Sequence, residues 1–120
     1  MIYLFSRPGT SLSRKILSPV PFKERFPAGR LKPPVGIQPG DVRSLPELYL
    51  FLAPDIASLP GINLNALPEW IETNIGDREL AASVQAIVDQ SVNYVEDCMK
   101  VYEAVGVRLE QARETIKEAT

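Results

Sequence analysis

Residues 77–120 read DRELAASVQAIVDQSVNYVEDCMKVYEAVGVRLEQARETIKEAT, and no proline interrupts them. Asp77 is an expected helix N-cap, and Glu79 follows in the first turn, where the helix dipole favours an acidic side chain. Small or apolar residues then recur at alternating steps of three and four, which is the heptad spacing of a helical contact seam. We therefore predict one long amphipathic helix over residues 77–120. Its coiled-coil-like seam comprises Ala81, Val84, Val88, Ser91, Val95, Cys98, Tyr102, Val105, Leu109, Ala112 and Ile116.

Gly106 is the weak point of this predicted helix, because glycine in a helix interior costs about 1 kcal/mol relative to alanine. It allows a kink, a close approach by another helix, or a turn that splits the segment in two. Neither proline nor Asn or Asp supports a turn there. We therefore expect the helix to continue through Gly106.

Prolines and charges divide the chain into two unlike parts. All eleven prolines lie at or before Pro68. Residues 1–43 hold eight Lys/Arg against two Asp/Glu, a net charge of +6, whereas residues 44–120 hold five against thirteen, a net charge of −8. Each proline removes a backbone donor and pushes the residue before it toward extended geometry. We therefore predict that residues 1–43 form an extended, basic, proline-rich arm.

The predicted arm carries regularly spaced apolar side chains, which a flexible linker would not need. These side chains pack either on the protein's own helices or on another subunit, and both alternatives stay open. We name nine candidate partner-binding residues from the arm and from the helical seam. They are Phe22, Phe26, Leu31 and Ile37 in the arm, and Val88, Val95, Tyr102, Leu109 and Ile116 in the helix.

Residues 44–76 are predicted to form short helices and turns between the arm and the long helix. Ser44-Leu45-Pro46-Glu47 fits a capping box, so a helix should run from there to about Leu52. A second turn is expected from Asp55 toward Leu59, and a third from Pro68 to Gly76. The predicted fold is therefore mainly α, in three segments: 1–43, 44–76 and 77–120.

We expect no catalytic, cofactor-binding or metal-binding site. The chain has no histidine, which is the commonest general base and metal ligand. Its glycines form neither a dinucleotide fingerprint nor a phosphate loop. Cys98, the only cysteine, lies on the apolar seam, where a buried thiol is inert.

Four basic residues of the arm are candidate contacts to phosphates or to an acidic protein surface: Arg14, Lys15, Lys23 and Arg25. Eight positive charges spread over 43 residues are sparse for a nucleic-acid tail, and no nucleic-acid-binding module is recognisable. We therefore expect protein surfaces to be the main partners, with nucleic acid as the alternative.

Together, these features predict a non-enzymatic structural or adaptor subunit of a larger protein assembly, such as a virion shell, a connector or a multi-subunit complex. A second alternative is a helical regulatory module that binds one partner enzyme. The single cysteine favours a reducing compartment. The longest apolar run, Leu48 to Ala53, is far shorter than a membrane span of roughly 20 residues. We therefore expect a cytoplasmic protein, or one within a particle assembled inside a cell, acting as a homo- or hetero-oligomer.

Overall fold

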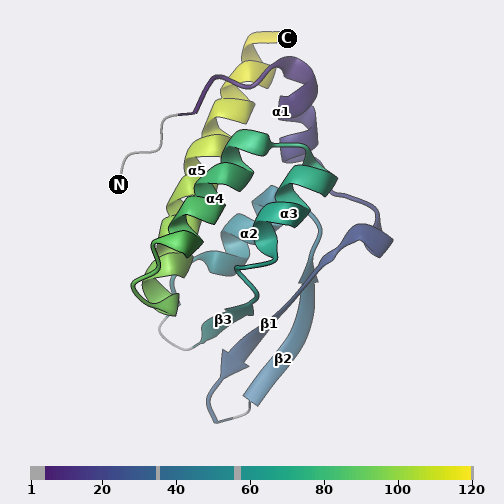
Figure 1. The fold of residues 1–120 in the computed structure, drawn as a ribbon. Helices are drawn as coiled ribbons and strands as arrows, with labels where there is room; N and C mark the ends of the chain where they lie inside the picture. Colours follow the sequence, from purple (N-terminus) through teal and green to yellow (C-terminus); the bar gives the residue numbers. More distant parts are fainter. Residues whose placement is uncertain (1–4, 35, 56–57, 120) are drawn as a thin grey trace.

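The computed structural model describes residues 5–34, 36–55 and 58–119. These residues form five α-helices and a three-stranded antiparallel sheet around one hydrophobic core (Figure 1). A 3₁₀ turn at Phe22–Glu24 precedes β1, and a π-helical turn at Ile71–Ile75 continues α3. The elements are α1 (Thr10–Leu17), β1 (Phe26–Lys32), β2 (Gly36–Val42), α2 (Leu45–Leu52), β3 (Leu59–Ile62), α3 (Leu67–Trp70), α4 (Arg78–Asp89) and α5 (Tyr94–Ala119).

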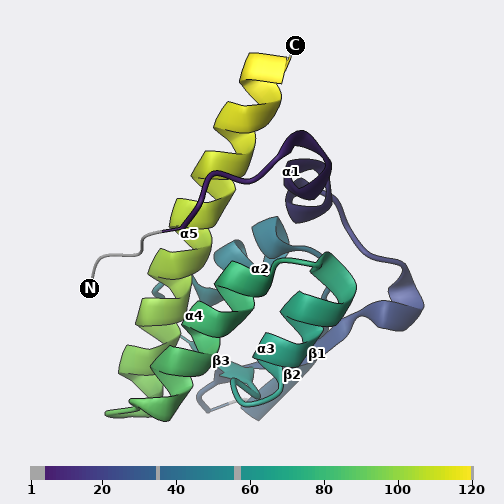
Figure 2. The same cartoon turned by 45° about the horizontal axis from the view of Figure 1, so that its top comes forward.

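The predicted single helix over residues 77–120 is two helices, α4 and α5, joined by residues 90–93. Asn93 begins α5, because its side-chain Oδ1 accepts a hydrogen bond of 2.9 Å from the backbone N–H of Glu96. Ser and Asn side chains compete for backbone hydrogen bonds, so they favour caps over helix interiors. The chain therefore reverses at this loop, and α4 packs beside α5 (Figures 1 and 2).

Most of the predicted seam is covered by the chain's own elements. α1, α2 and α4 all pack against α5. Seam residues from both helices are buried in this way, whereas Ser91 and Val95, next to the loop, are exposed. The buried seam residues are Ala81, Val84, Cys98, Val105, Leu109 and Ala112.

α5 continues through Gly106, as expected, and the glycine serves a close helix approach. A Cβ atom at this position would lie 2.8 Å from Cε1 of Tyr49 in α2, which is closer than van der Waals contact permits. The Tyr49 ring in turn stacks on Tyr102, with the ring centroids 4.4 Å apart. Gly106 therefore lets α2 lie against α5.

The predicted extended arm over residues 1–43 is wrong. Residues 10–17 form α1, whose Ile16 is fully buried, and Phe26–Lys32 and Gly36–Val42 pair as the antiparallel strands β1 and β2. β3 adds to the other side of β1, which gives the strand order β2-β1-β3. Phe26 of β1 contacts Trp70 at the end of α3, with 5.6 Å between the ring centroids. These residues are part of the core rather than an appendage to it.

The sheet tolerates its prolines because their nitrogens lie outside the hydrogen-bonded pairs of the strands. On the outer side of β3, the Ile62 N–H donates to the Tyr94 hydroxyl (3.0 Å), which itself donates to the Pro60 carbonyl (2.5 Å). Pro60 and Ile62 therefore face outward, so Leu59 and Gly61 bond to β1.

The same alternation, carried through the register, turns Pro39 of β2 toward solvent. Gly29 and Leu31 bond to β3, so Ala28 and Arg30 bond to β2, where they are opposite Gly40 and Gln38. Pro39 pairs with Gly29 in a position without ladder hydrogen bonds, and its ring replaces an N–H that would face solvent. The missing donor thus costs the sheet nothing.

Two of the short helical turns predicted over residues 44–76 are confirmed. The Ser44 side chain accepts a 3.1 Å hydrogen bond from the Glu47 N–H, and α2 ends at Leu52. The turn after α3 ends at Gly76, which has a left-handed φ of 88°. The predicted turn after Asp55 partly concerns residues 56–57, outside the described residues, and Leu59, its expected end, begins strand β3.

A buried ion pair joins α5 to the start of α4. Arg108 donates through Nε and Nη2 to the Asp77 carboxylate at 2.7 and 3.2 Å, and both side chains are almost completely buried. Asp77 also caps α4 through the Leu80 N–H. Arg108 donates further to the Ser6 carbonyl at 2.6 Å and lies over the Phe5 ring. One guanidinium thereby holds two helices and the N-terminal segment together.

We predict that Arg108→Met lowers the free energy of unfolding by about 3–5 kcal/mol, because it leaves the Asp77 carboxylate buried without its partner. Chemical denaturation measures this loss. The double variant Asp77→Asn/Arg108→Met should recover part of it, since no charge then remains buried. Arg113→Met is the matched control on the exposed face of α5 and should change little. Equal losses from Arg108→Met and Arg113→Met would contradict the prediction.

Candidate docking site

A row of three aliphatic side chains crosses the sheet. Leu31 of β1 is directly opposite Ile37 of β2 on one side and Leu59 of β3 on the other. Directly opposed residues of antiparallel strands point to the same face. This face turns away from the core, because Phe26, five positions from Leu31 on β1 and therefore on the opposite face, is buried. The row therefore presents apolar side chains to solvent.

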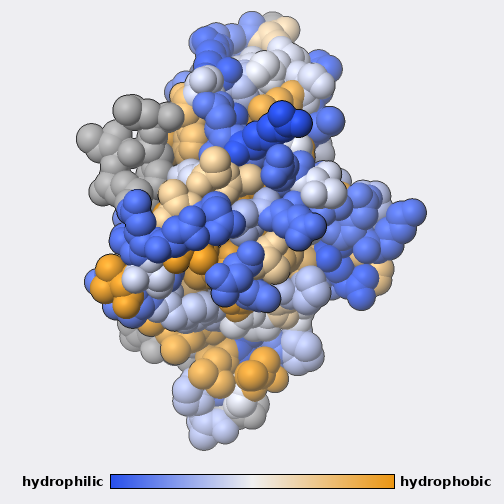
Figure 3. Space-filling model, viewed as in Figure 1, coloured by the Kyte–Doolittle hydropathy of each residue, from blue (hydrophilic) through white to orange (hydrophobic). Residues whose placement is uncertain are grey.

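The row continues onto the first turns of α5. Leu59 shares the lining of a pocket with Val95 and Met99. We call these five residues the apolar stripe; their exposed fractions are 73% for Ile37, 38% for Leu31, 44% for Leu59, 51% for Val95 and 43% for Met99. Figure 3 shows hydrophobic surface in the lower half of the molecule, where β3 and the open end of the sheet lie in Figure 1.

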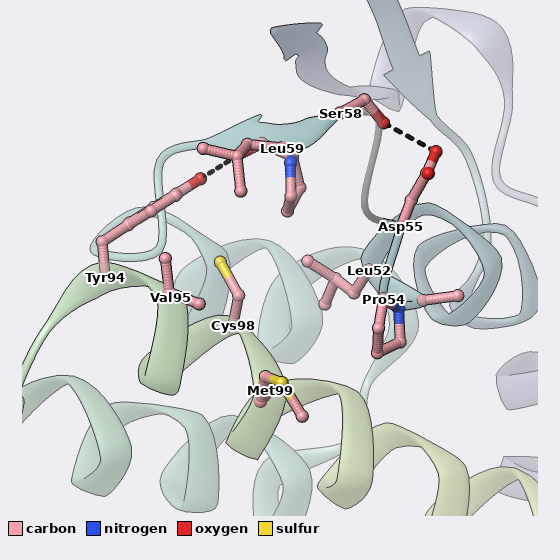
Figure 4. Close-up of a pocket in the computed structure, with 11 residues that line it drawn as sticks. Leu52, Pro54, Asp55, Ser58, Leu59, Tyr94, Val95, Cys98 and Met99 are labelled. Atoms are coloured by element: carbon pink, nitrogen blue, oxygen red, sulfur yellow. Dashed lines mark hydrogen bonds between the residues drawn. The ribbon is translucent and has the colours of Figure 1, made fainter. Parts of the chain in front are cut away.

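The pocket at the α5 end of the stripe has a volume of about 120 Å³. The end of α2, the start of β3 and the first turns of α5 form its walls (Figure 4). Its lining is mainly apolar, with Leu52 and Cys98 on the inner side and the Asp55–Ser58 hydrogen bond at one edge. An engineered apolar cavity of about 150 Å³ binds benzene, so this pocket has room for one aliphatic or small aromatic group.

Tyr94 forms the wall of the pocket next to β3. Its hydroxyl bonds to Pro60 and Ile62 on the outer edge of the strand. Burial raises the pKa of Tyr94 to about 12, although the hydrogen bond from the Ile62 N–H opposes part of that shift. The hydroxyl therefore stays protonated at neutral pH and keeps the edge of β3 occupied.

Cys98 contributes an apolar wall rather than a nucleophile. Its thiol is buried, and burial raises its pKa, which lowers the fraction of thiolate needed for attack. The hydrogen bond with Tyr94 lowers the pKa by less than burial raises it. The pocket thus offers shape and apolar contact instead of a reactive group.

Each edge of the sheet carries a feature that disfavours an additional strand. Tyr94 occupies the outer donors and acceptors of β3, and Pro39 removes the central outward donor of β2. Prolines on edge strands are a known defence against edge-to-edge pairing. The face of the sheet and the pocket therefore suit a partner better than either strand edge does.

The structure brings together three of the nine predicted partner-binding residues: Leu31, Ile37 and Val95. Phe26 and Leu109 are instead buried in the core. Val88, Tyr102 and Ile116 are half-buried. Phe22 is exposed elsewhere, before β1, with the Arg25 guanidinium 4.0 Å from its ring centroid.

The sequence prediction missed Leu59 and Met99. Leu59 precedes a Pro-Gly pair, which is typical of a turn, so the sequence does not indicate the strand that forms there. Met99 lies next to Cys98 of the predicted seam and is 43% exposed. A search for apolar residues beside the seam would have found Met99, but Leu59 required knowledge of the pairing with β1.

The four predicted basic contacts come from two elements. Arg14 and Lys15 belong to α1, and Lys23 and Arg25 lie just before β1. Arg25 is 3.7 Å from Asp41, so part of its charge is balanced within the chain.

Among residues 5–34, 36–55 and 58–119, no group of three or more Cys, Asp or Glu side chains could hold a metal ion. No helix in the same ranges has the length and hydropathy to cross a membrane.

Compared with protein-family models, curated proteins and solved structures, this chain matches none of them. Its function is therefore inferred from its own residues.

Tyr94 yields a prediction on alkaline stability. Its folded pKa of about 12 exceeds the ordinary value of 10.0, so the folded state holds this proton more tightly than the unfolded state does. The contribution is fully present below about pH 10 and is lost as the pH rises toward 12. Chemical denaturation from pH 8 to 12 should show that the unfolding free energy of the wild type falls more than that of Tyr94→Phe. A tyrosinate absorbance difference between the two proteins that titrates near pH 10 would contradict this.

Proposed function

We propose that the chain is a non-enzymatic structural or adaptor subunit of a larger protein assembly, and that it docks a partner protein on the apolar stripe. The observation that supports this is the gathering of five exposed apolar side chains beside a pocket of about 120 Å³. Scattered apolar side chains are ordinary on a protein surface, whereas a contiguous group with a pocket is typical of an interaction site.

Burial of the stripe would supply the affinity. Covering an aliphatic side chain completely is worth about 1.5–3 kcal/mol, and less when the side chain is already half-covered. Val95 and Met99 flank the pocket, so a partner side chain inserted there would be surrounded by apolar atoms on several sides. Such desolvated pockets are where most interface energy is concentrated.

The dimensions favour an amphipathic helix as the partner element. From Ile37 to Leu59 the row crosses two interstrand spacings, a span of about 10 Å. Two turns of an α-helix rise about 11 Å, so residues seven apart on a helix would reach both ends of the row. Strand addition is disfavoured, because Tyr94 occupies the outer groups of β3 and Pro39 interrupts the outward donors of β2. We therefore commit to a helix from another protein.

The proposal replaces the extended arm as the means of docking. The chain buries its own core, and its contact surface is assembled from β2, β1, β3 and α5. A virion shell, a connector or a multi-subunit complex inside a cell remains the proposed setting. No specific observation favours nucleic acid or an enzyme as the partner.

Helical peptides selected by display on the immobilised protein test the proposal. Selected peptides should carry apolar residues at spacings of three, four and seven, and fluorescence anisotropy should give dissociation constants that rise about tenfold or more in Ile37→Asp and in Val95→Asp. Both residues are exposed, so the thermal unfolding midpoint should change little.

Two variants serve as controls. Glu103→Lys lies on the exposed face of α5 and should bind the peptides normally, whereas Leu109→Asp places a charge in the core and should unfold the protein. Peptides that bind Val95→Asp as well as the wild type would contradict the proposal. Sedimentation that shows self-association, abolished by Ile37→Asp, would assign the stripe to a second copy instead.

A further inference from the structure

A second pocket, of about 290 Å³, lies on the other side of Tyr94 from the apolar one. It is formed by the loop after β3, the end of α4 and the first turn of α5. Its polar lining residues are Asn63, Asn65, Ser91 and Asp97, and the other lining residues are Ile62, Leu64, Val88 and Tyr94. Asp97 is the only carboxylate in the lining.

Asp97 is incompletely satisfied. Its side chain is only 5% exposed, and its Oδ2 accepts a hydrogen bond from the Ser91 hydroxyl. Its Oδ1 has no hydrogen-bond partner among the described residues. Buried acceptors are nearly always paired, and a carboxylate accepts readily at both oxygens. The first turn of α5 favours the negative charge through the helix dipole but donates no hydrogen bond to Oδ1.

One open carboxylate oxygen indicates which cation fits. A guanidinium binds carboxylates best through two parallel hydrogen bonds, and Ser91 already occupies Oδ2. A divalent metal ion would want several oxygen ligands with more negative charge than one carboxylate supplies. An ammonium group is a compact point charge that needs only Oδ1 and neutral acceptors, such as the Asn65 amide oxygen and the Ser91 hydroxyl.

The walls suit a ligand with an alkyl stem. Val88 is half-buried, and Tyr94 is also part of the lining. A methylene chain can lie against these surfaces while its ammonium head reaches the carboxylate. Oδ1 is shielded from solvent, so a ligand reaches it after side-chain rotation at the mouth. Asn65 is exposed and can rotate without disturbing the core, while the Ser91 hydroxyl keeps its hydrogen bond to Oδ2.

We propose that this pocket binds a primary alkylammonium group, with Asp97 Oδ1 as its anionic partner. Two sources share this chemistry: a lysine side chain of another protein, or a free amine such as a polyamine. The proposal is independent of the apolar stripe, which uses the opposite side of Tyr94.

Titration of the full chain with n-butylammonium at constant ionic strength, followed by amide chemical shifts, tests the site. We expect saturable shifts centred on Asn65, Ser91 and Asp97, with little effect from 1-butanol at the same concentrations. Asp97→Asn should weaken binding about tenfold or more, because it removes the charge from a charge-assisted hydrogen bond. Glu96→Gln is the matched control, since it removes a carboxylate from the same turn but outside the pocket.

Three outcomes would overturn the proposal: no saturable shifts in the wild type, equal shifts with 1-butanol, or equal binding by Asp97→Asn and the wild type. If Asp97→Asn does not fold, the location of the shifts in the wild type still decides, because shifts centred away from this pocket also overturn it.

Two further titrations distinguish the sources. Nα-acetyl-lysine amide against Nα-acetyl-norleucine amide reports on a lysine side chain, and spermidine reports on a free polyamine. Tighter binding of the first assigns the site to a protein partner, and tighter binding of the second assigns it to a small amine.

Discussion

The buried pair of Arg108 and Asp77 is the interaction on which the rest of the structure depends. A desolvated guanidinium is tolerated only when its hydrogen bonds are satisfied, and here Asp77 and the Ser6 carbonyl accept most of them. Because Asp77 also caps α4, the same contact sets where α4 begins and how it lies against α5. The N-terminal segment is drawn across α5 by the same side chain (Figure 2).

Local chemistry made part of this fold predictable. The capping box at Ser44 and the N-cap at Asp77 each depend on residues only three positions apart in the sequence, and both are present. The break at residues 90–93 was missed because the apolar heptad continues through it, although Asn93 followed by Glu96 is itself a start signal. The sheet is not evident from the sequence, because the many prolines of this segment indicate that it forms no strands. Whether Pro39 harms a strand depends on which way its nitrogen faces, and that is fixed only by pairing with β1.

The same reasoning explains which candidate contacts remained on the surface. Spacing along one segment identifies apolar residues but does not distinguish those that meet the protein's own core from those that do not. Leu31 and Ile37 are neighbours because the hairpin register opposes them, and Leu59 joins them from 28 positions beyond Leu31 only because β3 pairs with β1. Phe26, on the same strand, has the opposite parity and is buried. Tyr94 then closes the edge of β3 and separates the apolar pocket from the polar one around Asp97.

The central claim is that a folded, self-sufficient chain docks another protein through the apolar stripe. Photo-crosslinking in the cells that naturally produce the protein tests it most directly, with a photoreactive residue in place of Val95 in one strain and of Glu103 in another. Both positions are exposed on α5 and differ in whether they belong to the stripe. The account predicts that Val95 crosslinks to one protein, identified by mass spectrometry, and that Glu103 does not. Crosslinks of equal yield from both positions, or none from Val95, would contradict it.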